Sequence, residues 1–146
     1  GTENVAWGVA LATAVSALPE TELESARVRA LRDEFIAQVL TTVPQAGLTG
    51  NPVDRHPAIA SFTFAGLNGE TLLLELEQRG VVVSSGSACA AGSNDPSHVL
   101  IACGIEDDVA QTSVRFSMSH STTADELSTA ARALADAVSS VNGLGN

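Results

Sequence analysis

One of the two cysteines in this chain stands in a run of small residues. The run is Ser84-Ser85-Gly86-Ser87-Ala88-Cys89, and residues 90–94 continue it with no bulky side chain. Because such residues offer almost no apolar area to bury, we expect an exposed loop. A thiol there is reachable from solvent, as a reactive cysteine requires. Taken alone, these residues leave open a second interpretation, a small buried cysteine beside a turn.

A second candidate for chemistry is an arginine on a predicted strand. Residues 112–118 alternate apolar and polar side chains, and Arg115 stands on the polar side. A guanidinium near a core needs an acidic partner, and its planar fork fits a carboxylate with two parallel hydrogen bonds. That carboxylate belongs either to a bound substrate or to one of the 17 Asp and Glu residues of the chain itself.

Four motifs occur in a fixed order: Ser84 to Cys89, Pro96-Ser97-His98-Val99-Leu100, Ser113-Val114-Arg115-Phe116-Ser117-Met118, and Thr122-Thr123 before a final helix. This order resembles the cysteine desulfurases of the NifS/IscS type, which belong to the class V aminotransferases of PLP fold type I. The resemblance extends from Gly1-Thr2 to the last helix and is densest between Ser84 and Thr123. It implies that residues 1–146 are the C-terminal small domain of a longer enzyme dependent on pyridoxal 5′-phosphate (PLP). Residues 1–20 would form the helix that links it to an absent large domain.

The resemblance also implies roles for three residues. Cys89 would take sulfur from L-cysteine as a persulfide, leaving L-alanine, and deliver it to an iron–sulfur scaffold or another sulfur-acceptor protein. Arg115 would bind the substrate carboxylate. Thr2 would contact the PLP phosphate of the partner subunit in a homodimer, although a helix-capping role is an equal alternative. The chain has Ser117-Met118-Ser119 where relatives usually carry Ser-Leu-Gly, which removes no reactive group.

The chain contains no lysine, since all seven basic residues are arginine. Enzymes of this class hold PLP as a Schiff base on a lysine amine. We therefore expect this chain to be unable to bind the cofactor covalently and to be inactive by itself.

Two other functions remain open from the sequence. The first keeps the architecture and changes the substrate, as in a selenocysteine lyase or another PLP-dependent enzyme related to aminotransferases. The second is a non-catalytic module that docks an iron–sulfur scaffold protein. Preferential alkylation of Cys89 over Cys103 would support the catalytic assignment, and equal protection of both would favour the module.

Composition limits the remaining classes. A length of 146 residues suits one domain with an aliphatic core, given four Phe, one Trp and no Tyr. A net charge of −10 argues against nucleic acid and against an anionic membrane surface as partners. Two cysteines in a chain of this length do not form a disulfide scaffold, and no zinc-type spacing occurs. We expect a cytoplasmic protein without a metal site.

The periodicity predicts helices that alternate with short strands. Two helices have an apolar stripe that should face the core, formed by Val28, Leu31, Phe35 and Val39 in one and by Leu127, Ala130, Leu134 and Val138 in the other, and Ala60, Phe62 and Phe64 lie on one side of a strand. Thr123 and Glu126 match a capping box, Asn68 is a helix N-cap, and Gly80 stands where a left-handed helix end belongs. Helices are expected at 4–18 (Ala-rich and largely buried), from Thr21 to just before Pro44, at 68–79, from Pro96 to Gly104, and at 123–141, with strands at 58–64, 81–84 and 112–118. The predicted fold class is α/β of the α+β type, with a small, mostly antiparallel mixed sheet covered on one face by helices.

The remaining cysteine and the three histidines are predicted to have structural roles or to be exposed, without a part in the chemistry. Cys103 follows an apolar run and is predicted to be an inert core thiol. His98 stands in the predicted short helix, whose N-cap would be Asp95, and we expect it to satisfy backbone groups. His56 and His120 are predicted to lie in exposed loops.

Overall fold

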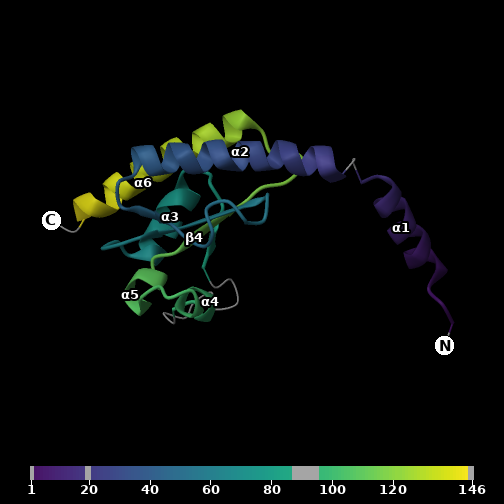
Figure 1. Ribbon diagram of the computed structural model, residues 1–146, viewed down its shortest axis with the longest axis horizontal. Coiled ribbons are helices and arrows are strands. Elements are labelled where there is room, and N and C mark those ends of the chain that lie inside the picture. Colours follow the sequence, from purple (N-terminus) through teal and green to yellow (C-terminus); the bar gives the residue numbers. More distant parts are fainter. Residues whose placement is uncertain (1, 19–20, 87–95, 145–146) are drawn as a thin grey trace.

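The computed structural model describes residues 2–18, 21–86 and 96–144. Its elements form a body in which helices cover a small sheet, with one helix extending away from it (Figure 1). In chain order they are α1 (Val5–Ser16), α2 (Thr21–Thr42), β1 (Ala46–Leu48), β2 (Ile59–Phe64), α3 (Gly69–Gln78), β3 (Ser84–Ser85), α4 (His98–Ala102), α5 (Asp107–Ala110), β4 (Val114–Ser117) and α6 (Ala124–Leu144).

The four described strands form one sheet in the order β1-β2-β4-β3, and every neighbouring pair is antiparallel. Strand β4 therefore lies between β2 and β3, with Arg115 opposite Ser61 on one side and Ser84 on the other. The predicted fold class is confirmed, and no parallel pair occurs among the strands that the structure describes.

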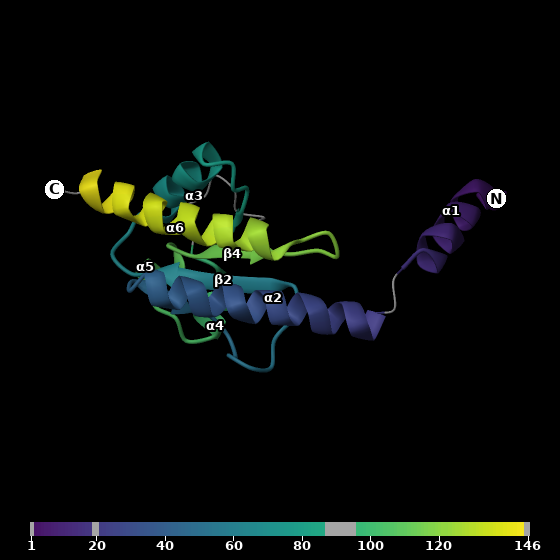
Figure 2. The ribbon, with the colours of Figure 1, turned by 90° about the horizontal axis from the view of Figure 1, so that it is seen from above.

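Helices α2, α3 and α6 form a layer on one face of the sheet, and α4 and α5 lie on the opposite side of the strands (Figures 1 and 2). The core lies between the sheet and the three-helix layer. All four Phe residues meet there, with the ring centroids of Phe35 on α2 and Phe116 on β4 only 5.0 Å apart. The face of the sheet turned away from this layer is called the open face below.

Three periodic patterns of the sequence predict the packing of α6, α2 and β2. The stripe Leu127, Ala130, Leu134 and Val138 of α6 is buried. On α2, Val28, Phe35 and Val39 are buried, and Leu31, the fourth residue of that stripe, is partly buried against the core. On β2, the side chains of Ala60, Phe62 and Phe64 point into the core, as the alternation predicts.

Local signals at helix ends are also confirmed. The Thr123 amide donates to Glu126 Oε2 at 2.8 Å, and the Glu126 amide donates to Thr123 Oγ1 at 3.3 Å, which completes a capping box at the start of α6. The amide and the hydroxyl of Thr123 both donate to the Glu126 carboxylate, and these two bonds lower the pKa of Glu126. Asn68 caps α3 by accepting from the Thr71 amide, and Gly80 follows α3 at φ 78°, a left-handed conformation that glycine adopts freely.

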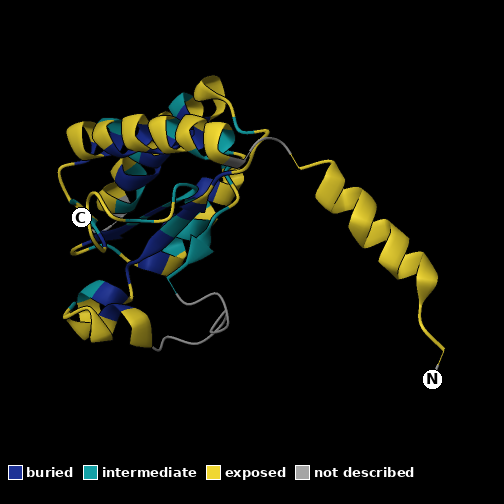
Figure 3. Ribbon diagram, turned by 45° about the vertical axis from the view of Figure 1, so that its right-hand side comes forward, coloured by how far each residue is buried: buried dark blue, intermediate teal, exposed yellow. Residues whose placement is uncertain are grey.

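The predicted burial of the first helix is wrong. Every residue of α1 is exposed, including Trp7 at 77% and Leu11 at 67% (Figure 3). An Ala-rich apolar composition is typical of a buried helix, but the helix is buried only where another surface covers it. Helix α1 extends away from the sheet and its helical layer, so the described part of the chain does not cover it.

Three predictions around the small-residue run also need correction. Residues 81–83 are not a strand: β3 consists of Ser84 and Ser85 alone, and Val82 is 85% exposed. Helix α4 begins at His98 with Ser97 as its N-cap, while Asp95 lies outside the described residues. Cys103 is exposed rather than a core thiol, because α4 is five residues long and buries only Leu100.

Candidate functional site

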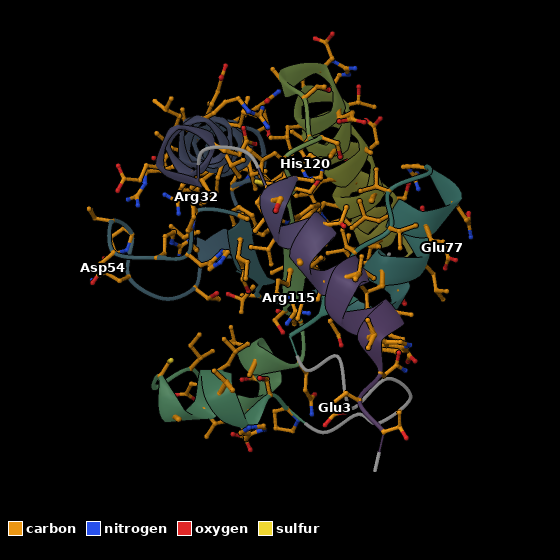
Figure 4. All side chains as sticks on the ribbon, turned by 90° about the vertical axis from the view of Figure 1, so that its right-hand side faces the viewer. Glu3, Arg32, Asp54, Glu77, Arg115 and His120 are labelled. Atoms are coloured by element: carbon orange, nitrogen blue, oxygen red, sulfur yellow. The ribbon has the colours of Figure 1, made fainter. Side chains whose placement is uncertain are left out.

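The open face of the sheet carries a polar row centred on Arg115. Its neighbours along β4, Val114 and Phe116, are buried in the core, so strand alternation turns Arg115 to the other side. Ser61 of β2 and Ser84 of β3 are the residues paired with it, and all three are partly buried. Figure 4 shows the Arg115 side chain leaving the sheet on the side of α4 and α5.

The Arg115 guanidinium has no hydrogen bond or ion pair with any of the residues that the structure describes. Three other arginines in that part of the chain do pair with carboxylates: Arg27 with Glu24 at 2.7 Å, Arg32 with Asp33 at 2.6 Å and Arg79 with Glu75 at 2.5 Å. The alternative that Arg115 forms an internal salt bridge therefore finds no partner among the described carboxylates. A half-buried guanidinium with open donors is suited to an added anion such as a carboxylate.

The segment that leads toward Cys89 leaves the sheet beside this row. The Gly86 amide donates to the Ser113 carbonyl at 3.2 Å, and the Ser97 hydroxyl donates to the Gly86 carbonyl at 3.4 Å. Residue 86 must be small, since a Cβ there would lie 1.9 Å from Ser113 Oγ. Gly86 and the buried Ser97 are thus held together at the edge of the sheet, a contact that the pattern of small residues did not predict.

Two of the three predicted site residues are not brought together with Arg115 by the described structure. Cys89 lies outside the described residues. Thr2 is exposed just before α1, at the end of the chain that extends away from the sheet (Figure 1). Of the histidines, His56, His98 and His120 are all exposed.

A pair of arginines lies apart from this row and has a structural role. Arg32 is 1% exposed and donates to the carbonyls of Arg55 and His56, which ties the 49–57 loop to α2. Burial, with the nearby charge of Arg32, lowers the pKa of Arg55. The Arg55 side chain donates to the carbonyls of Thr49 and Asn51 within the same loop.

Within residues 2–18, 21–86 and 96–144, no three His, Cys, Asp or Glu side chains come together in a way that could hold a metal ion. The helices in those ranges include none with the length and apolar character needed to cross a bilayer.

The family model named aminotransferase class-V matches residues 1–129. The chain belongs to this family. Among curated class-V relatives, cysteine desulfurase NifS from Azotobacter vinelandii is 44% identical over 128 residues, which cover 87% of this chain and 32% of the relative. Cysteine desulfurase IscS from Dictyoglomus turgidum is 40% identical over 128 residues, with the same coverage. An IscS-like cysteine desulfurase from Mycobacterium tuberculosis is 40% identical over 141 residues, 94% of this chain and 36% of the relative.

The chain thus spans about one third of the length of the curated class-V relatives that it matches. A solved structure of a NifS-like protein from Rickettsia africae superposes with a TM-score of 0.72 at 24% identity, covering 95% of this chain and 36% of that one. A second NifS-like protein gives a TM-score of 0.66 at 22% identity over 79% of this chain and 28% of that one. These likenesses establish a shared fold.

Proposed function

We propose that this chain is the C-terminal small domain of a PLP-dependent cysteine desulfurase. In this proposal, Arg115 binds the carboxylate of L-cysteine and Cys89 receives its sulfur. The observation that carries the proposal is the Arg115 guanidinium on the open face, which pairs with none of the described carboxylates and lies beside the strand that leads toward Cys89. The similarity to proteins named cysteine desulfurase supports the choice of reaction.

Arg115 suits a carboxylate because of its position on the sheet. The strand backbone holds the Arg115 Cα between those of Ser61 and Ser84. The neighbours Val114 and Phe116 are buried in the core, which fixes the face of the sheet on which Arg115 lies. Because no described residue occupies its donors, the guanidinium can donate to both oxygens of one carboxylate in a bidentate pair. Such a pair fixes the orientation of a small amino acid as well as its affinity.

Cys89 can reach the neighbourhood of Arg115 on grounds of chain length alone. Gly86, held at the sheet edge by Ser113 and Ser97, precedes it by three residues, and three residues span at most about 11 Å. The transfer would convert the Cys89 thiol and L-cysteine into a Cys89 persulfide and L-alanine. The S–C bond of the substrate breaks, one S–S bond forms and a proton moves to the β-carbon, so no external oxidant is needed.

The residues of this chain do not by themselves make a PLP site. No lysine is present to form the Schiff base, and Thr2, which we assign to the PLP phosphate of the partner subunit in a homodimer, lies away from Arg115 of its own chain. The lysine amine that holds the cofactor would have to come from polypeptide beyond this chain. We assign to the chain itself carboxylate binding and sulfur acceptance, followed by delivery to an iron–sulfur scaffold or another acceptor.

The test uses the complete product of the gene that contains this chain, incubated with L-cysteine and assayed for alanine and for protein-bound persulfide. Cys89→Ser should abolish the persulfide. Arg115→Leu should lower kcat/KM for L-cysteine by about 10- to 150-fold, the equivalent of a lost charge-assisted pair of about 1.5–3 kcal/mol, and Arg115→Lys should retain part of the activity.

Arg132→Leu is the matched control, because Arg132 is an exposed arginine on α6 whose side-chain hydrogen bonds to described residues go only to Ser128 and Thr129. It should leave kcat/KM unchanged. Arg115→Leu should also leave the unfolding free energy within about 1 kcal/mol of the native value, since no described ion pair is lost. A native kcat/KM in Arg115→Leu would rule out the assigned role.

A further inference from the structure

The two serines that flank Arg115 have side chains that the fold itself does not use. Ser61 and Ser84 are both partly buried, yet neither hydroxyl has a hydrogen bond to any residue that the structure describes. By contrast, the buried Ser97 hydroxyl donates to the Gly86 carbonyl. Polar side chains withdrawn from water normally have a partner, so these two hydroxyls and the guanidinium between them indicate a place for a ligand.

The position of Ser61 is fixed by its backbone rather than by its hydroxyl. The Thr49 amide donates to the Ser61 carbonyl at 2.9 Å, and Thr49 Oγ1 donates to the same oxygen at 3.1 Å. Thr49 is itself buried, which holds this contact in place. A ligand can therefore engage the Ser61 hydroxyl without breaking a bond on which the fold depends.

The hydrogen-bond pattern of the sheet brings Ser61 close to Arg115. The Met118 amide donates to the Ala58 carbonyl at 2.8 Å, which extends the β2–β4 ladder by one step. Hydrogen-bonded and non-hydrogen-bonded pairs alternate along an antiparallel ladder, so the Ser61–Arg115 pair, three steps away, is of the non-hydrogen-bonded kind. Side chains lie closer together in that kind of pair.

Ser84 occupies the corresponding place on the other side of Arg115. It stands directly opposite Arg115 in the β3–β4 ladder, and the bond from the Gly86 amide to the Ser113 carbonyl secures that register two residues along. Residues directly opposite each other point to the same face, with Cβ atoms about 4.5–5.5 Å apart. The three side chains thus form a row about 10 Å wide across three strands, on the side toward which Arg115 leaves the sheet (Figure 4).

A carboxylate can use all three of these groups together. A bidentate pair with a guanidinium engages one lone pair on each carboxylate oxygen. An ionised carboxylate has about four such lone-pair sites, so each oxygen keeps a second one, directed away to either side of the pair. A hydroxyl on each flanking strand is suited to donate to that second site.

We propose that Ser61 and Ser84 are carboxylate-binding residues, each donating its hydroxyl to one oxygen of the carboxylate that Arg115 holds. The inference rests on the proposed function, because it extends the site assigned there to Arg115. The two flanking donors fix the rotation of the carboxylate about the guanidinium axis, and they make the row selective for ligands that carry this group.

Calorimetric titration of the complete gene product with 3-mercaptopropionate tests the site without any reaction. This probe keeps the thiol, the carboxylate and the chain length of L-cysteine and lacks the amine. Ser61→Ala and Ser84→Ala should each raise its Kd by about 3- to 30-fold, the range from a typical net hydrogen bond to one with a charged group. Ser61→Thr and Ser84→Thr keep the hydroxyl and suit a strand, so they should retain most of the affinity.

Ser117→Ala is the matched control, because Ser117 is an exposed serine on the same face of β4, two residues from Arg115. It should leave the Kd within about twofold of the native value, since it flanks neither side of the guanidinium. Native affinity in the double variant Ser61→Ala/Ser84→Ala, or no binding of the probe by the native protein, would overturn the inference.

A second pair of variants tests the proximity of Ser61 to Arg115 without relying on the hydroxyl. Ser61→Asp places a carboxylate opposite the guanidinium, where opposite charges on neighbouring strands pair. It should raise the Kd at least about tenfold more than Ser61→Asn, which has the same size and no charge. Equal Kd values for these two variants would contradict the proposed contact.

Kinetics with L-cysteine separate binding from a merely structural role. The alanine variants should raise KM and leave kcat unchanged, because the carboxylate bonds are the same in the ground state and the transition state; a lower kcat with a native KM would refute the assignment. Probe binding that depends on Arg115 and both serines, in a protein that forms no alanine, would uphold this site and refute the proposed reaction. Native probe binding by both serine variants, in a protein that Arg115→Leu inactivates, would do the reverse.

Discussion

Replacing Gly86 by alanine tests how the sheet edge beside Arg115 is held. A Cβ at this position would stand 1.9 Å from Ser113 Oγ, 3.0 Å from Ser113 Cβ and 3.1 Å from Leu100 Cδ1. Rotation of the Ser113 hydroxyl relieves the first contact, but the other two remain inside ordinary van der Waals distance. Overpacking of this kind costs about 1–3 kcal/mol. For a domain of this size, we expect Gly86→Ala to lower Tm by about 2–10 °C.

The assay is urea unfolding followed by far-ultraviolet circular dichroism, with the midpoint and the slope compared between variants. Gly143→Ala is the matched control, since a Cβ there meets nothing within 4 Å, and alanine in a helix raises stability by up to about 1 kcal/mol. Ser113→Gly removes both Ser113 contacts and completes a double-mutant cycle. We expect the two substitutions to couple favourably by about 0.5–3 kcal/mol.

The reasoning is refuted if Gly86→Ala unfolds at the native urea midpoint and shows no coupling to Ser113→Gly. That outcome would mean that the β3 end moves freely away from Ser113 and Leu100. The hydrogen bonds of Gly86 would then not hold the segment that leads toward Cys89.

Three further predictions concern the helices. Leu134→Ala, at a fully buried position of α6, should lower the unfolding free energy by about 2–5 kcal/mol in urea; a loss below 1 kcal/mol would contradict the packing. The hydrogen bonds from Thr123 lower the pKa of Glu126, so they stabilise the fold at pH values above the usual glutamate pKa. That stabilisation is lost as pH falls through the lowered pKa. The difference in unfolding free energy between the native protein and Glu126→Gln should therefore shrink from pH 6 to about pH 3. Exposed Cys103 should react with a thiol reagent in the folded chain, and Cys103→Ser should change stability by less than about 0.5 kcal/mol, which makes that variant the background for labelling Cys89.

The predictions that succeeded are those in which periodicity reports directly on burial. The stripe of α6 and the alternation of β2 and β4 were predicted correctly, because a residue that faces the core must be apolar whichever element covers it. The capping box of Thr123 and Glu126 was predictable for a different reason: its hydrogen bonds are local to one helix turn.

The predictions that failed concern segments whose burial depends on a partner. Helix α1 has a composition typical of a core helix, yet composition cannot say which surface covers it. Residues 81–83 are as apolar as a buried strand, but of the segment 81–85 only Ser84 and Ser85 pair with β4. Cys103 follows an apolar run, and its exposure results from the small size of α4, which buries a single side chain.

The sequence by itself determined that this chain has an arginine on the polar side of a strand, a cysteine among small residues and no lysine, since these are matters of residue type and spacing. Only the tertiary structure decided that Arg115 lies between Ser61 and Ser84, and that none of the described carboxylates reaches it. The physical reason is strand order. Inserting β4 between β2 and β3 brings together residues that are distant in the chain, and no local periodicity encodes which strands become neighbours.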